Sequence, residues 1–233
     1  KEGSGEVNWA TGVTNVPARK ETHLHRTLES LRAAGFECPR LFVDGCKDPG
    51  EYAQFGLEVR TRYPSVRTAG NWMLALAELY LRDPHAERFA MFQDDFVTYR
   101  NLRVYLERCP YPGKGYWNLY TFPENQALAN GRRGWYPSNQ RGEGAVAIVF
   151  NNEATRLLLG HQRMFYRAMN PERGWRFIDG GIVEAMKEAG WVEYVHNPSL
   201  VQHTGRESTI TQKRFIPAIS FRGEEFNAEE LIL

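Results

Sequence analysis

Two adjacent carboxylates, Asp94 and Asp95, end an apolar run in the segment MFQDDFVTYR, residues 91–100. Neighbouring carboxylates repel each other, so their place at the end of a buried strand favours a cationic partner. Mg²⁺ and Mn²⁺ take oxygen ligands, often one or two carboxylates together with substrate phosphates. Adjacent strand residues point to opposite faces, so one carboxylate can bind an ion while the other braces a loop. The alternative is that Asp94 caps a turn and Asp95 pairs with an arginine.

Two residues of the second half could also do chemistry. His203, in the segment VQHTG, ends the last predicted strand. A neutral imidazole is a good Mn²⁺ ligand, although a lone histidine is more often a packing or surface residue. Asp179 precedes two glycines in RFIDGGIVEAM. It is either the N-cap of the helix predicted there, or a general base that accepts a proton from an attacking hydroxyl.

Three polar residues of the first half could bind a nucleotide. Asp44 at a strand-end turn could accept from a base N–H or a ribose hydroxyl, and Asn71 could bind a ligand hydroxyl or cap a helix. Arg19 could lie on the surface or clamp a diphosphate. The sequence contains no Walker A, GxGxxG or GxSxG motif, so the P-loop, Rossmann and hydrolase-elbow interpretations lose support.

Alternating strands and helices must position these residues. Hydrophobic patterns predict strands at 7–14, 40–45, 56–62 and 88–95, and helices at 20–35 and 70–83. This alternation is typical of βαβ units and a mainly parallel sheet. Ligands of open α/β sheets bind beyond the carboxyl ends of the strands. We therefore expect the acidic pair, Asp44 and the turn after Thr14 to face one crevice.

The second half has a less regular pattern. Strands are predicted at 144–150 and 191–205 and helices at 151–160 and 179–190, whereas residues 99–141 are rich in loops. We expect one α/β domain with a mainly parallel open sheet flanked by helices and an irregular acceptor-side half.

The composition is that of a soluble globular protein. Hydrophobic residues make up 42%, charged residues 24%, and the net charge is +1. Such a charge gives no general electrostatic reason to bind nucleic acid or a membrane. No apolar run approaches the roughly 20 residues of a membrane span. Cys38, Cys46 and Cys109 have no metal-type spacing, so reduced thiols and a cytoplasmic location are predicted.

Residues 99–141 combine positive charge with aromatic side chains. They hold seven Lys or Arg against two Glu, a local net charge of +5. Trp117, Trp135 and Tyr136 could be stacking platforms for a glycan acceptor, and the cations could contact the phosphates of nucleic acid. The alternative is a solvated surface with aromatic core anchors.

In their order along the chain, these segments resemble the GT-A type glycosyltransferases. WATGVTNVPAR resembles their first strand and nucleotide loop, and FQDDF resembles their metal-binding DxD motif. NPSLVQHTG is similar to the PSLVQH-x-G segment of the branching N-acetylglucosaminyltransferase IV group and related bacterial or viral enzymes. The resemblance covers most of residues 7–210. It implies a nucleotide-sugar-binding half (7–98), an acceptor and catalytic half (99–210) and a C-terminal tail (211–233).

The resemblance implies a metal-dependent enzyme that transfers a sugar from a UDP-sugar to an acceptor hydroxyl. Asp95 and His203 would bind Mn²⁺ or Mg²⁺, and Asp179 would be the general base of an inverting reaction; a retaining reaction stays open. The implied donor-binding residues are Thr14, Arg19, Asp44, Asn71, Gln93 and Asp94. Gln93 departs from the family pattern, because it occupies the first, normally acidic, DxD position.

Three alternatives remain open at this stage. The same transfer could act on hydroxymethylated bases of DNA, as in phage-type enzymes. The chain could instead be a non-catalytic module that binds a nucleotide sugar or a glycan, for which Gln93 is the best support. A metal-dependent phosphohydrolase ranks last, because it needs more clustered Asp and His ligands than the sequence offers.

Overall fold

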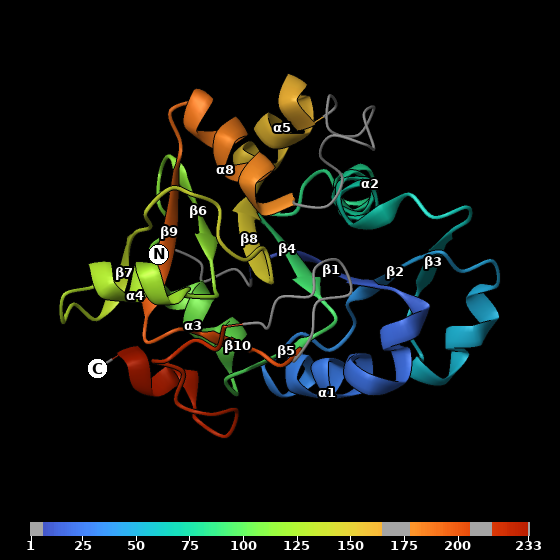
Figure 1. Ribbon diagram of the computed structural model, residues 1–233, viewed down its shortest axis with the longest axis horizontal. Helices are drawn as coiled ribbons and strands as arrows, with labels where there is room; N and C mark the ends of the chain where they lie inside the picture. Colours follow the sequence, from blue (N-terminus) through green and yellow to red (C-terminus); the bar gives the residue numbers. More distant parts are fainter. Residues whose placement is uncertain (1–6, 165–177, 206–215, 233) are drawn as a thin grey trace, which may run out of the picture.

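The computed structural model describes residues 7–164, 178–205 and 216–232. An eight-stranded sheet with the order β3-β2-β1-β4-β8-β6-β9-β7 forms its centre (Figure 1). Its first half contains the mutually parallel strands β1 (Trp9–Asn15), β2 (Arg40–Asp44), β3 (Val59–Arg62) and β4 (Arg88–Gln93). The predicted parallel arrangement of the first half is confirmed.

The second half extends the same sheet. Its strands are β6 (Gly115–Asn118), β7 (Gly134–Pro137), β8 (Ala147–Asn151) and β9 (Val192–Asn197). β8 runs antiparallel to both β4 and β6, β9 is parallel to β6, and β7 is antiparallel to β9. The sheet is thus continuous through both halves and mainly parallel.

Helices cover both faces of the sheet (Figure 1). On one face lie α2 (Arg67–Arg82), α5 (Asn152–Gly160) and α8 (Ile178–Glu188). Trp72, Leu76 and Leu79 of α2 recur at helical spacing and are buried in this layer. On the other face lie α1 (His25–Ala33), α3 (Leu102–Arg108) and the C-terminal turn η4 (Ala228–Ile232).

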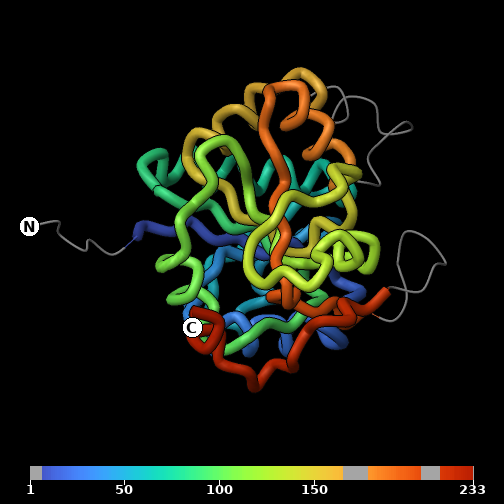
Figure 2. The backbone as a smooth tube through the Cα atoms, turned by 90° about the vertical axis from the view of Figure 1, so that its left-hand side faces the viewer, coloured from blue at the N-terminus to red at the C-terminus, as the bar shows by residue number. Residues whose placement is uncertain are grey.

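A separate two-stranded sheet lies on the α1 side. It pairs β5 (Phe96–Thr98) antiparallel with β10 (Val201–His203). The C-terminal segment runs along the lower side of the molecule (Figure 2), where Phe221 stacks on Tyr99 with ring centroids 4.8 Å apart. This small sheet brings His203 next to the end of β4.

Several short elements were not indicated by the sequence pattern. The segment 99–141 contains α3, β6, α4 (Pro123–Leu128) and β7 in addition to loops. The helix predicted for 20–35 is divided into a π-helical turn, η2 (Lys20–Leu24), and α1. Two 3₁₀ turns, η1 (Pro17–Arg19) and η3 (Pro49–Phe55), follow β1 and β2. None of the described helices is long and apolar enough to cross a membrane.

Candidate functional site

The carboxyl ends of β1, β2 and β4 meet at one edge of the sheet. The register pairs Asn15 with Val43 and Thr14 with Gln93, so the ends of these strands are level. β8 is antiparallel to β4 and begins opposite Phe92, which places the start of β8 at the same edge. As predicted, residues from several strand ends converge here.

Asp94 forms hydrogen bonds with Asn15, the last residue of β1, and with Arg19 in the turn after it. It is buried at 3% exposure. Asn15 Nδ2 donates to Asp94 Oδ2 at 2.6 Å, and Arg19 Nη1 lies 3.1 Å from Oδ1. Tyr52 donates its hydroxyl to Asn15 Oδ1 at 2.8 Å and so fixes the Asn15 amide. Both oxygens of Asp94 therefore have partners.

Asp95 is fully buried, but only one of its two carboxylate oxygens has a partner among the described residues. Its Oδ2 lies 2.6 Å from Arg19 Nη1 and 3.4 Å from His203 Nε2. Its Oδ1 is buried and has no hydrogen-bond partner among the described residues. A buried carboxylate oxygen without a partner is costly, so this atom is a candidate ligand atom.

The imidazole of His203 is neutral and has a defined tautomer. Burial lowers the His203 pKa to about 3, and the Arg19 charge adds to this effect. Gly205 donates its backbone N–H to His203 Nδ1 at 3.1 Å, so the ring proton resides on Nε2, facing Asp95. Coordination of a metal through Nε2 would need the other tautomer and the loss of the Gly205 contact.

Among the described residues, the groups paired at this site carry more negative than positive charge. Burial raises the pKa of the Asp94 carboxyl to about 6, and the Asp95 charge adds to this, while Arg19 opposes both. Burial likewise raises the pKa of Asp95, against the lowering effect of Arg19. Burial lowers the pKa of Arg19, but the two carboxylates outweigh it and leave that pKa above its usual value. Two carboxylates and one guanidinium near neutral pH favour a further cation.

A divalent cation fits this donor set in part. Among the described residues no group of three or more His, Cys, Asp or Glu could hold a metal ion. Asp95 and His203 would supply two ligands, which suits a cation that takes its other ligands from a diphosphate and water. Asp95 Oδ1, which has no partner in the part of the chain that the structure describes, agrees with such a site.

A contact with the loop before β8 places Asp179 near the same edge of the sheet. It is half-buried in the first turn of α8, and its Oδ2 accepts the Gly144 N–H at 3.2 Å. Val146, two residues further on, accepts the backbone N–H of Gln93 at 2.8 Å. The loop before β8 thus links Asp179 to the end of β4.

The loop before β8 packs tightly against the start of α8. A Cβ on Gly142 would lie 2.7 Å from the Asp179 backbone oxygen, so a side chain is excluded there. Asn118 Nδ2 donates to the Gly144 carbonyl at 3.1 Å and to Glu193 Oε2 at 3.3 Å. The position of Asp179 therefore depends on β6 and β9 as well as on its own helix.

The other predicted donor-binding residues lie at this edge or behind it. Asp44 accepts from Ser65 Oγ at 2.6 Å and from the Val66 N–H at 2.8 Å, and so braces the turn before α2. Asn71 is buried and donates to the Phe42 carbonyl at 3.0 Å. Thr14 Oγ1 donates to the Phe92 carbonyl at 3.3 Å, and Gln93 is the half-buried last residue of β4.

Two of the three aromatic residues predicted to bind the acceptor are buried in the core. Trp117 is fully buried, and Tyr136 is 3% exposed. Half-buried Trp135 stacks on Trp117 with ring centroids 4.7 Å apart. In this conformation Trp117 and Tyr136 are core anchors, the alternative that the sequence left open.

Sequence reasoning missed three residues that build the site. Asn15 and Tyr52 orient Asp94, and the Thr27 hydroxyl contacts the Asp94 and Phe96 carbonyls, each at 2.9 Å. Asn15 directly follows Thr14, so its place at a strand end was a usable signal. Tyr52 and Thr27 gave no such signal, because only the tertiary packing brings them to the acidic pair.

The comparisons with known proteins give the class of fold. No protein-family model matches the sequence, and the comparison with curated proteins gives no match. The solved structure of GalNAc-T7 with UDP, GalNAc and Mn²⁺ is similar over 85% of this chain, with a TM-score of 0.52 and 12% identity. The match covers 44% of that chain, so this chain spans less than half the length of that relative.

A second solved structure is more distant. The nucleoside-diphosphate-sugar pyrophosphorylase from Vibrio cholerae RC9 is 10% identical, with 84% of this chain and 95% of that chain covered and a TM-score of 0.46. The topology and the similarity to GalNAc-T7 together show a GT-A-like α/β fold.

Proposed function

We propose that the protein is a metal-dependent glycosyltransferase that moves a sugar from a nucleotide sugar, with UDP as the nucleotide, to an acceptor hydroxyl. The observation that carries the proposal is Asp95. Its Oδ2 contacts Arg19 and His203 at the carboxyl edge of a GT-A-like sheet, while its buried Oδ1 has no hydrogen-bond partner among the described residues. In such folds this edge is the ligand-binding side.

The charge balance supports a metal with the donor. A diphosphate would be repelled by Asp94 and Asp95, whose ion-pairing Lys or Arg partner among the described residues is Arg19. A divalent ion held by Asp95 and His203 would reverse the sign of the site and stabilise the negative charge that builds on the leaving diphosphate. Arg19 would contact the diphosphate, and Asp94, held by Asn15, would keep the loop in place.

We assign the nucleoside part of the donor to the remaining strand ends. Asp44 and Asn71 lie at or behind the end of β2, Gln93 ends β4, and Thr14 is the penultimate residue of β1. Carboxylate and amide groups at these positions can accept from, or donate to, a uracil edge and ribose hydroxyls.

We assign the role of general base to Asp179 in an inverting reaction. Its carboxylate accepts the Gly144 N–H through Oδ2, which orients the group. A half-buried carboxylate near the sheet edge can take the proton of an acceptor hydroxyl as the new bond forms.

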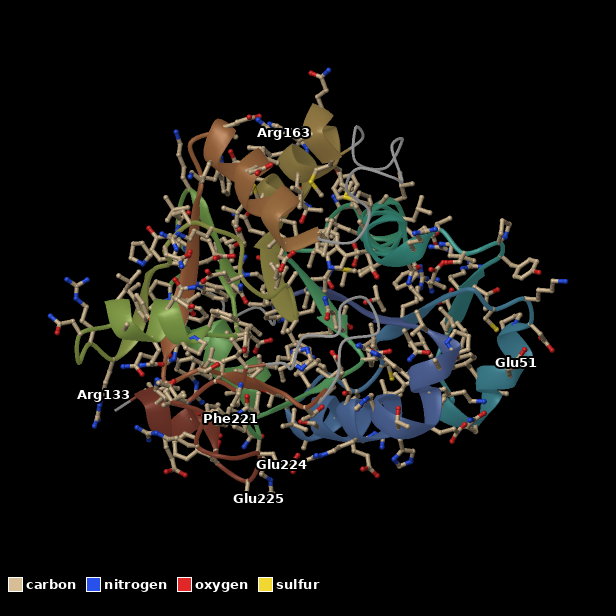
Figure 3. The ribbon with its side chains drawn as sticks, in the orientation of Figure 1. Glu51, Arg133, Arg163, Phe221, Glu224 and Glu225 are labelled. Carbon is tan, nitrogen blue, oxygen red and sulfur yellow. The ribbon has the colours of Figure 1, made fainter. Side chains whose placement is uncertain are left out.

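The acceptor is a glycan or another hydroxyl compound, with hydroxymethylated DNA as a second candidate. Lys114, Arg132, Arg133 and Arg141 are exposed. No ion pair of these four is found within the described residues, which leaves them available to an anion. Arg133 lies at the opposite end of the long axis from Glu51 (Figure 3). A DNA acceptor would make transfer fall steeply with salt, whereas a small neutral acceptor would not.

A thermal-shift panel of nucleotide sugars with and without MnCl₂ tests the proposal. UDP-sugars with Mn²⁺ should stabilise the protein, and slow Mn²⁺-dependent donor hydrolysis should disappear in Asp95→Ala. If no nucleotide diphosphate stabilises the protein, the proposal is wrong. Binding without any hydrolysis or transfer would instead support the non-catalytic module.

A further inference from the structure

Arg19 forms ion pairs with both carboxylates of the acidic pair, Asp94 and Asp95. Its side chain is 13% exposed, and its Nη1 lies 3.1 Å from Asp94 and 2.6 Å from Asp95. Both carboxylates are almost completely buried. A guanidinium in this position neutralises one of two buried negative charges.

The contacts of Arg19 leave part of the guanidinium unused. Within the described residues, its side-chain hydrogen bonds and ion pairs all run through Nη1. A guanidinium has five N–H donors in a planar fork that matches phosphate oxygens. Arg19 can therefore form new contacts with a diphosphate that its present carboxylate contacts do not provide.

The backbone at Arg19 joins two unlike helical turns. Arg19 ends the 3₁₀ turn η1, and the π-helical turn η2 begins at the next residue. Its φ of −108° and ψ of −1° are a right-handed helical conformation at the boundary between the two turns. Single π-helical turns are rare and frequently lie at functional sites. This junction is a natural place for a side chain that exchanges partners.

We propose that Arg19 is the resident cation of the acidic pair, which keeps a divalent ion from Asp95 until a diphosphate draws the guanidinium away. An ion at Asp95 Oδ1 would lie within a few ångströms of Arg19, because Asp95 contacts Arg19 through its other oxygen. The two cations repel each other strongly in so buried a place. A diphosphate between them removes this repulsion, so metal and nucleotide bind cooperatively. This inference rests on the proposed function, since it takes the diphosphate of the donor as the partner.

Calorimetric titration of MnCl₂ into the protein without nucleotide tests the inference directly. Arg19→Gln removes the charge but keeps an amide donor for the carboxylates, so Mn²⁺ should bind at least about tenfold more tightly than to the natural protein. Arg19→Lys keeps the charge and should bind Mn²⁺ as weakly as the natural protein. Equal Mn²⁺ affinity of Arg19→Gln and the natural protein would overturn the inference.

Two further variants locate the effect. Arg40 is a matched control, because it is also buried and ion-paired, with Glu58 at 2.8 Å, but begins β2 at the opposite edge. Arg40→Gln should leave Mn²⁺ affinity unchanged, and a gain equal to that of Arg19→Gln would contradict a local role. Adding Asp95→Asn to Arg19→Gln should abolish the gained binding, and its persistence would place the ion elsewhere.

A destabilised variant does not end the test. If Arg19→Gln fails to fold, Arg19→Gln combined with Asp94→Asn removes one buried carboxylate together with the guanidinium. That protein should show the same tighter binding of Mn²⁺, and natural affinity would overturn the inference.

Thermal shifts with UDP separate this inference from the proposed function. In the natural protein, MnCl₂ and UDP together should raise the Tm by more than the sum of their separate shifts, and in Arg19→Gln the excess should shrink. If UDP stabilises neither protein, the proposed function fails while the Mn²⁺ titration still tests Arg19. If UDP stabilises both and the excess is unchanged, Arg19 has no such role although the donor assignment stands.

Discussion

Asp94 and Asp95 share one guanidinium nitrogen, Arg19 Nη1, at 3.1 and 2.6 Å. The two carboxylates are nonetheless unequal. Asp94 is completed by Asn15, whereas Asp95 keeps one buried oxygen without a partner among the described residues. Adjacent residues of the same type thus have different environments, and their substitutions should have different effects.

Asp95→Asn and Asp94→Asn should separate metal binding from support. Asp95→Asn removes the charge beside the unpartnered oxygen, so the stabilisation by UDP that depends on Mn²⁺ should weaken by at least about tenfold in apparent affinity. Asp94→Asn should keep this dependence, because both oxygens of Asp94 already have partners, Asn15 and Arg19. Thermal shifts against MnCl₂ concentration measure both. The reverse result would exchange the roles of the two residues.

Asp179→Asn should abolish transfer without loss of donor binding. The amide oxygen of Asn can still accept the Gly144 N–H, so the loop contact of 3.2 Å in the natural protein is conserved. The amide cannot accept the acceptor proton, and transfer should fall by about 100-fold or more. Product formation and UDP-dependent thermal shifts are measured on the same sample. Transfer at the natural rate would mean that Asp179 only braces the loop.

Gly144→Ala should destabilise the protein far more than Gly131→Ala. Both glycines have positive φ angles, +80° and +78°, so each substitution carries a similar backbone strain of about 1 kcal/mol. Only at Gly144 would the Cβ clash, 2.6 Å from the buried Tyr120 ring, whereas nothing lies within 4 Å at Gly131. The clash should add about 1–3 kcal/mol in denaturant unfolding. Equal losses would show that the loop before β8 can move away from Tyr120.

Glu193→Gln should stabilise the protein at neutral pH but not in acid. Burial raises the pKa of Glu193 from 4.5 to about 7, and the Asp179 charge adds to this. A raised pKa of an acid means that the folded state binds the proton more tightly than the unfolded state. The stability from this group is therefore complete below pH 4.5 and is lost as the pH rises through about 7.

The variant lacks this titration, so its advantage should grow with pH. It should approach roughly 3 kcal/mol above neutrality and vanish near the acid limit. Denaturant unfolding at about pH 5 and about pH 8 measures the difference. An advantage that is independent of pH would mean that Glu193 does not titrate in this range.

The strands and the convergence of their ends could be predicted from the sequence. Strong apolar runs before Asp44 and Asp94 indicated buried parallel strands, and parallel strands necessarily end at one edge. The sequence also left open that Asp95 pairs with an arginine, and the structure shows Arg19 as that partner. The metal, donor and base assignments stay predictions.

The remaining parts of the site could not be predicted because they depend on contacts between distant segments. Gly144 meets Asp179 only because the loop before β8 packs on the start of α8. The strands β6 and β7 are four residues each, too short to show a reliable pattern. The roles of Trp117 and Tyr136 could not be assigned from the sequence, because the same residue types form glycan-stacking platforms and core anchors.

The small sheet of β5 and β10 has a consequence for synthesis of the chain. β5 follows the acidic pair directly, but its only described pairing partner lies about 100 residues later, where Thr98 Oγ1 donates to the Leu200 carbonyl at a separation of 102 residues. On the ribosome, Asp95 is therefore synthesised long before His203. β5 has no β10 to pair with until β6 to β9 have been synthesised. Unpaired strand edges are prone to aggregation, so the pairing of β5 depends on completion of the chain as far as β10.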